Sequence, residues 1–374
     1  MLKKLVFPLI LTLIMTVTAS ADSAKSSILA DAESGRIIYS KNARQMLGMA
    51  STTKIMTAIV ALENSSLDET VTVSYAAAST EGSSMYLKAG EKIKMESLLY
   101  GLMLNSGNDA ATAIAEHISK STDEFAVLMN KKAEKIGLKD THFSNPHGLD
   151  NEHHYSTAYD MAMLARYAMK NEKFREIVSS KKKIVEKDGI PNSRYLTNHN
   201  RLLGMYEYCT GIKTGFTKSC GRCLVSSAEK DGVKLIAVTL CDPDDWNDHI
   251  SMYNDAFSKY SSYVIIPKNS YVCSVEVPNL KTTAALYAKN DICATLTEQE
   301  YNNLSVEYNT QKSVNAPVYI GQKLGTAIVM LGSEPIGSTD LITRYGIELK
   351  YKSGISDKFM FLVTSLLSLF KVSA

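Results

Sequence analysis

The fold is decided by the stretch ASTTKIM at residues 50–56. Ser51 and Lys54 are three residues apart, so a helix beginning here would place the serine hydroxyl and the lysine amine on one face. The apolar residues that follow at helical spacing are Ile55, Met56, Ile59, Val60 and Leu62. They predict a helix with a broad apolar face and with Ser51 as its N-cap or first-turn residue. An uncharged lysine in this position can take the proton of a serine hydroxyl that attacks a carbonyl carbon.

A second motif, Ser106-Gly107-Asn108, lies in a predicted loop between two helices. Ser106 can relay a proton to a departing amine, because a hydroxyl both donates and accepts hydrogen bonds. The Asn108 side chain can hold the Lys54 amine and donate to the amide carbonyl of a substrate. Alone, this string is typical of an ordinary turn, so its meaning depends on the motifs around it.

The third motif, Lys213-Thr214-Gly215, is predicted to lie on an edge strand, where an extended peptide can pair with the backbone. Gly215 would allow the peptide to approach closely. Lys213 and Thr214 would offer a positive charge and a hydroxyl to a carboxylate. The backbone N–H groups of Ser51 and Phe216 are candidates for an oxyanion hole.

In this order, the three motifs indicate a serine that is acylated by a peptide or by a β-lactam. The candidate catalytic residues are Ser51, Lys54 and Ser106. The candidate substrate-binding residues are Asn108, Lys213, Thr214, Gly215, Phe216 and Thr217. Serine and lysine account for the reaction, so we expect no cofactor and no metal, although His147, His153 and His154 could suggest zinc.

The first 21 residues are typical of a secretion signal. Lys3 and Lys4 precede an apolar stretch at residues 5–17, and Ala19-Ser20-Ala21 places small residues at the recognition positions. We expect cleavage after Ala21 and export of the remaining chain. The alternative is an uncleaved membrane anchor, for which the apolar stretch is short.

The charge of the chain excludes one class of partner. The formal net charge is +2, and removal of Lys3 and Lys4 with the leader makes the rest of the chain neutral. A nucleic-acid-binding protein would carry a strong basic excess, so we expect no nucleic-acid partner. The length of the exported chain allows two domains, each with its own core.

The chain has six cysteines. They are Cys209, Cys220, Cys223, Cys241, Cys273 and Cys293. Export permits disulfides, but an even number does not establish them. The spacing of Cys220 and Cys223 would suit a redox centre or a zinc knuckle, yet no second cysteine pair or histidine cluster of matching spacing supports either. Buried free thiols and one or two disulfides both remain open.

The pattern along the exported chain predicts an α+β domain followed by a β domain. A hairpin at residues 27–39 precedes helices at 95–103, 110–119, 122–136 and 159–169. Strands at 221–228 and 233–240 and a closing helix at 248–260 follow. We therefore expect helices around an antiparallel sheet whose first and last strands come together.

The composition changes near residue 261, where short Val, Ile, Tyr and Thr runs begin. These runs, at residues 271–277, 283–287, 304–308, 324–331 and 336–343, predict a small all-β domain. The stretch FMFLVTSLLSLF at residues 359–370 is too short to span a bilayer but fits a helix at a membrane surface. The alternative is a terminal helix packed on the β domain. The expected segments are 1–21, 22–262, 263–352 and 353–374.

Four stretches make the chain resemble the D-alanyl-D-alanine carboxypeptidases, which are low-molecular-mass penicillin-binding proteins. They are ASTTKIMTA at residues 50–58, NSGNDAA at 105–111, HGLD at 147–150 and GIKTGFT at 211–217. The likeness covers roughly residues 26–260, and the β domain more loosely. It implies a β-lactamase/transpeptidase-like α/β (α+β) catalytic domain and a β domain that carries it on the outer face of the bacterial cytoplasmic membrane.

The resemblance also implies an activity. Ser51 would form the acyl-enzyme, Lys54 would accept the proton, Ser106 would complete the site and Lys213 would bind substrate. The reaction would remove the terminal D-alanine from peptidoglycan pentapeptides, which limits the donors for cell-wall cross-linking. Penicillin and other β-lactams would inhibit by acylating Ser51.

The chain departs from the pattern of this family at three positions. Gly48 stands where many relatives carry proline, and His199 occupies a position associated with Arg, Lys or Thr. Cys220 beside Cys223 is unusual, whereas a lone cysteine near Cys223 is not. None of these changes removes a catalytic group.

Two other functions fit parts of the pattern. A class A β-lactamase shares the serine, the lysine and the third motif, but it hydrolyses the acyl-enzyme with a glutamate, for which Glu152 is the candidate. A non-catalytic peptidoglycan-associated scaffold would be favoured by loss of Ser51, Lys54 or Lys213, and all three are present. Endopeptidase cleavage of cross-links is a further variant of the main function.

Overall fold

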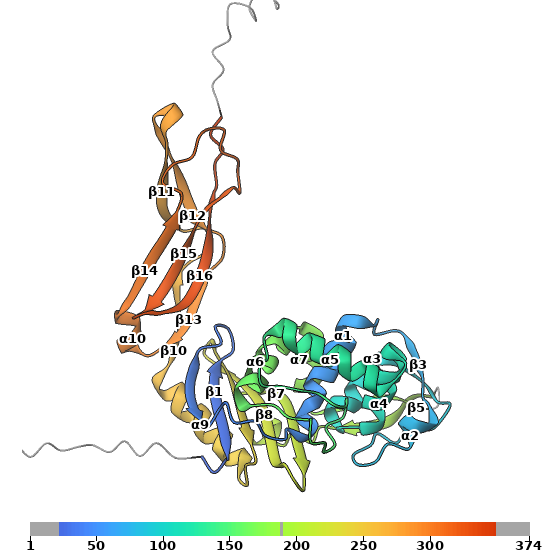
Figure 1. The fold of residues 1–374 in the computed structure, drawn as a ribbon. Coiled ribbons are helices and arrows are strands. Elements are labelled where there is room, and N and C mark those ends of the chain that lie inside the picture. The colour runs from blue at the N-terminus through green and yellow to red at the C-terminus, as the bar shows by residue number, and fades with distance from the viewer. Residues whose placement is uncertain (1–21, 188–189, 349–374) are drawn as a thin grey trace, which may run out of the picture. The chain divides into compact units, whose positions relative to one another are not determined.

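The computed structural model describes residues 22–187 and 190–348 (Figure 1). The chain divides into two compact units, one ending at Ser261 and the other beginning at Ser262. The leader at residues 1–21 and the apolar C-terminal stretch both lie outside the described residues. Within the ranges that the structure describes, no helix is both long and apolar enough to cross a bilayer.

The first unit is built on a five-stranded antiparallel sheet with the order β2-β1-β9-β8-β7. The strands are β1 (Ser26–Asp31), β2 (Ile37–Lys41), β7 (Cys209–Thr217), β8 (Gly221–Lys230) and β9 (Val233–Leu240). Ile28 of β1 pairs with Val238 of β9, so the first and last strands of the domain lie together, as predicted. The predicted edge strand with the third motif is β7, which lies at one end of this order.

Helices cover both faces of the sheet, because successive residues of a strand point to opposite sides. Ile28 belongs to a large core with the helices of one face, and Leu29 to a smaller core with the helices of the other. The first face carries α1 (Lys54–Asn64), α3 (Met95–Leu104), α4 (Asn108–Ser119), α5 (Thr122–Ile136), α6 (Ala158–Ala168) and α7 (Glu172–Ser179). The second carries α8 (Leu202–Met205) and α9 (Asp245–Lys259).

Local chemistry sets several helix ends. The Ser121 side chain accepts a hydrogen bond from the backbone N–H of Glu124 at the start of α5, and Gly137 ends that helix in a left-handed conformation. Thr157 caps α6 in the same way by accepting from Asp160. These caps explain why the predicted bounds of α5 match the observed ones.

Several elements of the first unit were not predicted from the sequence. They are β3 (Thr70–Thr72), α2 (Tyr75–Ala78), β4 (Lys92–Lys94), β5 (Lys182–Lys187) and β6 (Ile190–Thr197). β3 pairs with β4 and β5 pairs with β6 in two separate ribbons. A strand of three residues is too short to show the alternation that identifies strands in a sequence.

The second unit is dominated by β-structure, as predicted. Its main sheet has the order β11-β12-β16-β15-β14, and a smaller sheet joins β10 to β13. The elements are β10 (Ser261–Ile266), β11 (Tyr271–Val277), η2 (Pro278–Leu280), β12 (Thr282–Ala288), β13 (Ile292–Leu296), α10 (Glu298–Asn302), β14 (Leu304–Thr310), β15 (Lys323–Leu331) and β16 (Glu334–Thr343). Its own core includes Val277, Leu286 and Val329, so this unit has an independent apolar interior.

A buried ion pair joins β6 to the segment before β4. The Arg194 guanidinium forms two contacts with the Glu91 carboxylate, at 2.8 and 3.0 Å, and both side chains are buried. We expect Arg194→Met to lower the free energy of unfolding by about 3 kcal/mol, because it leaves a buried carboxylate without its counter-charge. Urea unfolding followed by the fluorescence of Trp246, the chain's single tryptophan, measures this in the first unit.

Lys234→Met is the matched control. Lys234 pairs with Glu33 at 2.9 Å, but both side chains are largely exposed, so its loss should cost less than about 1 kcal/mol. Equal effects of the two substitutions would contradict the structural role of the Arg194 pair.

Candidate active site

Ser51 lies in a tight turn rather than in the first turn of an α-helix. A 3₁₀ helix, η1 (Ala50–Thr53), comes before α1, which begins at Lys54. Ala50 has a φ of +47°, in the left-handed region that non-glycine residues rarely adopt. The Thr53 hydroxyl donates to the Ala50 carbonyl at 2.7 Å and fixes this conformation. The turn holds Ser51 partly exposed above a buried helix.

The amine of Lys54 is fully buried and has three partners. Its Nζ lies 2.9 Å from Ser51 Oγ, 2.7 Å from Asn108 Oδ1 and 2.5 Å from the His147 carbonyl oxygen. The last two partners only accept hydrogen bonds. A neutral amine has two N–H groups, which these two oxygens occupy, so its lone pair is left facing the Ser51 hydroxyl. The arrangement suits removal of the serine proton.

Electrostatics favours the neutral form of this amine. Burial lowers the pKa of Lys54 well below its usual value, and the positive charge of Lys213 lowers it further, while Asp109 opposes both effects. Burial also lowers the pKa of Lys213, to about 7. The Lys213 amine donates to the Thr214 carbonyl at 2.9 Å. Burial and the charge of Lys213 therefore both make the Lys54 amine a weaker base.

The second motif lies at the start of α4. Asn108 is the first residue of that helix, and its side-chain nitrogen donates to the Glu81 carbonyl while its oxygen accepts from Lys54. Ser106 is buried, has a φ of +57° and precedes Asn108 by two residues. The amide of Asn108 is thus oriented from both sides.

Asp109, which was not among the predicted site residues, connects a neighbouring loop to this motif by hydrogen bonds. Its carboxylate accepts from the backbone N–H groups of Met85 and Leu87 and from the Ser84 hydroxyl. The carboxylate is buried, and these donors supply its hydrogen bonds. The segment around residue 85 is thereby held beside Asn108.

The third motif lies within β7, beside the Ser51 turn. A Cβ atom added at Gly215 would lie 3.0 Å from the Ser51 nitrogen, so only glycine allows the strand this close. Phe216 is 66% exposed on the edge strand. The Thr217 hydroxyl donates to Asp150 Oδ1 at 2.8 Å. Of the predicted substrate-binding side chains, Phe216 is therefore open to solvent, whereas the Thr217 hydroxyl already has an internal partner.

The loop at residues 147–150 closes the other side of the turn. A Cβ atom at Gly148 would lie 2.1 Å from the Ala50 carbonyl oxygen, and its φ of +88° also requires glycine. This contact places the His147 carbonyl on the Lys54 amine. Burial lowers the pKa of His147 to about 3, so its ring is neutral.

His154 stabilises the turn that carries Ser51 by a hydrogen bond to Thr53. Its Nδ1 accepts from the Ser144 backbone N–H at 3.0 Å, so Nε2 carries the proton and donates to the Thr53 hydroxyl at 2.7 Å. Burial lowers the pKa of His154 to about 4. Among the described residues, no group of three or more His, Cys, Asp or Glu side chains could hold a metal ion. His154 is thus a positioning residue of the turn.

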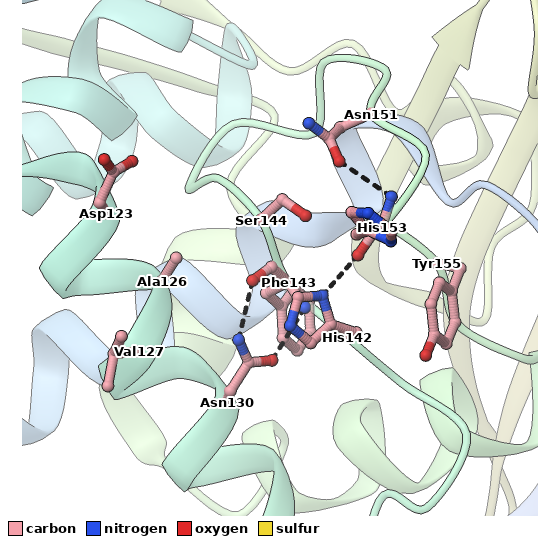
Figure 2. Close-up of a pocket in the computed structure, with 10 residues that line it drawn as sticks. All are labelled: Asp123, Ala126, Val127, Asn130, His142, Phe143, Ser144, Asn151, His153 and Tyr155. Atoms are coloured by element: carbon pink, nitrogen blue, oxygen red, sulfur yellow. Dashed lines mark hydrogen bonds between the residues drawn. The ribbon is translucent and has the colours of Figure 1, made fainter.

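A hollow of about 600 Å³ is lined by residues of α5 and of the segment at 142–155 (Figure 2). The Asn130 amide bonds to both backbone groups of Phe143 in its wall. The His142 ring bonds to the His153 carbonyl oxygen. None of the predicted catalytic or substrate-binding residues lines this hollow.

Two departures from the family pattern contact each other. A Cβ atom at Gly48 would lie 2.3 Å from Cys220 Sγ, and Cys223 Sγ lies 3.8 Å from the Gly48 carbonyl oxygen. All six cysteines are free thiols. Cys220 therefore occupies the space that a larger residue at position 48 would need, three residues before Ser51. The third departure, His199, is exposed and donates its backbone N–H to the Leu104 carbonyl.

Comparison with known proteins gives consistent matches over both units. Residues 14–244 match the family described as D-alanyl-D-alanine carboxypeptidase, and residues 260–348 match the penicillin-binding protein 5, C-terminal domain. The D-alanyl-D-alanine carboxypeptidase DacF of Bacillus subtilis is 33% identical over 352 residues, which cover 90% of each chain. DacC of Escherichia coli is 33% identical over 350 residues, covering 89% of this chain and 86% of that protein.

A solved structure agrees with these matches. Penicillin binding protein 5 from Haemophilus influenzae has a TM-score of 0.74 at 28% identity, covering 89% of this chain and 99% of that one. The likeness extends over both units, so it supports the fold predicted for each of them.

The contact between Gly48 and Cys220 predicts that a substitution of Cys220 can compensate for the destabilising effect of a substitution of Gly48. Gly48→Ala should lower the free energy of unfolding by about 1–3 kcal/mol, because its methyl group overlaps the Cys220 sulfur. Cys220→Ala removes that sulfur, so the double variant should recover most of the loss. The measurement is a double-mutant cycle by urea unfolding with Trp246 fluorescence. Additive effects of the two substitutions would contradict the contact.

Proposed function

We propose a residue-level mechanism for this chain, which belongs to the D-alanyl-D-alanine carboxypeptidase family. The chain is a serine-type carboxypeptidase that removes the terminal D-alanine of peptidoglycan pentapeptides, and the family also binds β-lactams. The matches support this activity rather than that of a class A β-lactamase. Glu152, the base which that alternative requires, is an exposed loop residue.

In the first step, the substrate pairs in an extended conformation with the edge of β7 that has no strand partner among the described residues. The carboxylate of its terminal D-alanine binds the Lys213 amine and the Thr214 hydroxyl. Ser51 Oγ attacks the carbonyl carbon of the last peptide bond while Lys54 takes the serine proton. The backbone N–H groups of Ser51 and Phe216 stabilise the negative oxygen that forms.

The second step breaks the C–N bond. The proton held by Lys54 passes through the Ser106 hydroxyl to the nitrogen of D-alanine, which leaves as a neutral amine. An ester joins the shortened peptide to Ser51. Lys54, neutral again, accepts a proton from a water molecule that attacks this ester, and the proton then returns to Ser51 Oγ. A β-lactam follows the first step, but its amine stays attached to the acyl group.

One observation carries this mechanism. The Lys54 amine is buried, lies 2.9 Å from Ser51 Oγ and has two carbonyl oxygens as its other partners. A charged lysine here would direct an N–H group to each of its three partners, including Ser51 Oγ, and could not accept a proton. The nearby buried Lys213 favours the neutral form of Lys54.

We also propose that the chain is exported and rests on the outer face of the bacterial cytoplasmic membrane. The sequence of residues 1–21 supports export, because it has the basic start, apolar stretch and small residues of a signal peptide. The apolar run at 359–370 supports attachment to the membrane surface. Both segments lie outside the described residues.

Ser51→Ala should abolish acylation, because no other group takes the place of its oxygen beside Lys54. We expect release of D-alanine from a pentapeptide to fall by at least about a thousandfold and labelled penicillin to leave no covalent adduct. The exposed Ser258 of α9 gives the control substitution Ser258→Ala, which should retain both activities. A covalent adduct on the Ser51→Ala protein would contradict the assignment of the nucleophile.

The pH dependence of acylation tests the coupling of the two lysines. Acylation rises with pH as Lys54 loses its proton, and the charge of Lys213 lowers the Lys54 pKa. Lys213→Met removes that charge, so the pKa of Lys54 rises and the rising limb of the pH–rate profile moves to higher pH. The burial effect remains, so the limb stays below the usual lysine pKa. The rate of penicillin acylation against pH measures the midpoint.

Lys182→Met, at an exposed position of β5, is the control for this experiment. Its profile should match that of the unmodified chain. If the rising limb of the Lys213→Met protein lies at the same pH as that of the unmodified chain, or at a lower pH, the proposed coupling is contradicted, whatever the absolute rate.

A further inference from the structure

Three large side chains of the second unit are exposed on segments close to the last described residue. Tyr319 is 67% exposed, Ile320 is 74% exposed and Tyr345 is 68% exposed. We call these three residues the exit patch. The last described residue, Glu348, follows Tyr345 by three positions. Soluble surfaces carry scattered apolar residues, but a cluster at one end of a domain indicates an interaction surface.

Backbone contacts hold the two loops of the exit patch together. Val318 and Ile347 exchange hydrogen bonds at 2.9 and 2.8 Å, and the Gly321 N–H donates to the Thr343 carbonyl at 2.8 Å. A Cβ atom at Gly346 would lie 3.8 Å from Ile320 Cγ1, so the Ile320 side chain lies next to the residue that follows Tyr345. The patch is therefore preformed, and binding would order little further chain.

The chemistry of the exit patch fits the boundary between lipid and water. Tyrosine has an apolar ring and a polar hydroxyl, and it is enriched at the level of lipid headgroups. Ile320 adds an aliphatic side chain that can enter the acyl boundary. Arg344 is exposed beside Tyr345 and lies over the Tyr287 ring at 5.3 Å, where its charge can attract a lipid phosphate.

The sequence beyond the patch indicates which surface covers it. The apolar run begins at Phe359, twelve residues after Ile347, so it starts within about 40 Å of the patch even when the intervening chain is fully extended. Lys350, Lys352 and Lys358 lie in that connection. Once the run is bound to a membrane, the short connection keeps the exit patch at a high effective concentration near the same lipids.

We propose that the exit patch is a second membrane contact, which binds the headgroup region of an anionic bilayer while the C-terminal segment is attached. This inference rests on the membrane attachment proposed above. A single flexible attachment leaves the second unit free to rotate at the surface, whereas two contacts give it one preferred orientation. A second copy of the chain on the patch is the competing occupant, and the experiment below separates the two.

The first test is flotation of the full exported chain with vesicles of phosphatidylcholine and phosphatidylglycerol. We expect Tyr319→Ser/Ile320→Ser/Tyr345→Ser to lower the partition coefficient by about tenfold. The matched control is Tyr75→Ser/Val264→Ser/Tyr308→Ser, which removes two exposed tyrosines and one exposed aliphatic residue elsewhere and should leave partition unchanged. Equal partition of all three proteins would overturn the proposal, as would a change of oligomeric state in the patch variant without a change in flotation.

A second test reports on the patch itself. Tyr319→Trp in the full chain should give an indole whose emission shifts to the blue and is quenched by brominated lipids, beyond the background of Trp246 in the parent chain. Flotation without such quenching would overturn the exit patch but leave the C-terminal attachment standing. No flotation of the unmodified chain would overturn the attachment, and the exit patch with it.

Discussion

The buried amine of Lys54 is the constraint on which the rest of the active site depends. A fully buried lysine amine is stable only if it is neutral or paired with an opposite charge, and only if its N–H groups have acceptors. Burial itself favours the neutral form. Asn108 and the His147 carbonyl are those acceptors, and they come from two segments far from Lys54 in the sequence. The neutral amine then has one lone pair, and Ser51 is the group that faces it.

Two glycines make this arrangement sterically possible. Gly215 allows β7 to lie against the Ser51 nitrogen, and Gly148 allows the next loop to lie against the Ala50 carbonyl. Between them, the turn at Ala50 adopts a left-handed conformation that its side chain would otherwise disfavour. His154 and Thr53 fix the same turn by hydrogen bonds. Ser51, the proposed nucleophile, is therefore positioned by the surrounding segments rather than by its own helix.

The sequence correctly predicted features that depend on residues close together in the chain, such as the bounds of some helices and strands. The bounds of α5 and β11 match the structure because their caps and apolar periods are clear. The ribbon of β3 with β4 was missed because each strand has only three residues, and the ribbon of β5 with β6 was missed because apolar and polar residues alternate weakly in it. The motifs identified Ser51, Lys54 and Asn108, but the contact of His154 with Thr53 joins residues 101 positions apart. No local pattern could show that pairing. Nor could one show that the Cys220 sulfur occupies the space that a side chain at position 48 would need.

The proposed mechanism requires Lys54 to be neutral in the resting enzyme at a pH where an ordinary lysine is charged. The most direct test is NMR titration of the lysine side chains in protein labelled with ¹³C at the ε-carbon, with the Lys54 signal assigned from its absence in Lys54→Arg. We expect the Lys54 signal to titrate well below the usual lysine pKa of 10.5. A Lys54 signal that titrates at or above that value would contradict it.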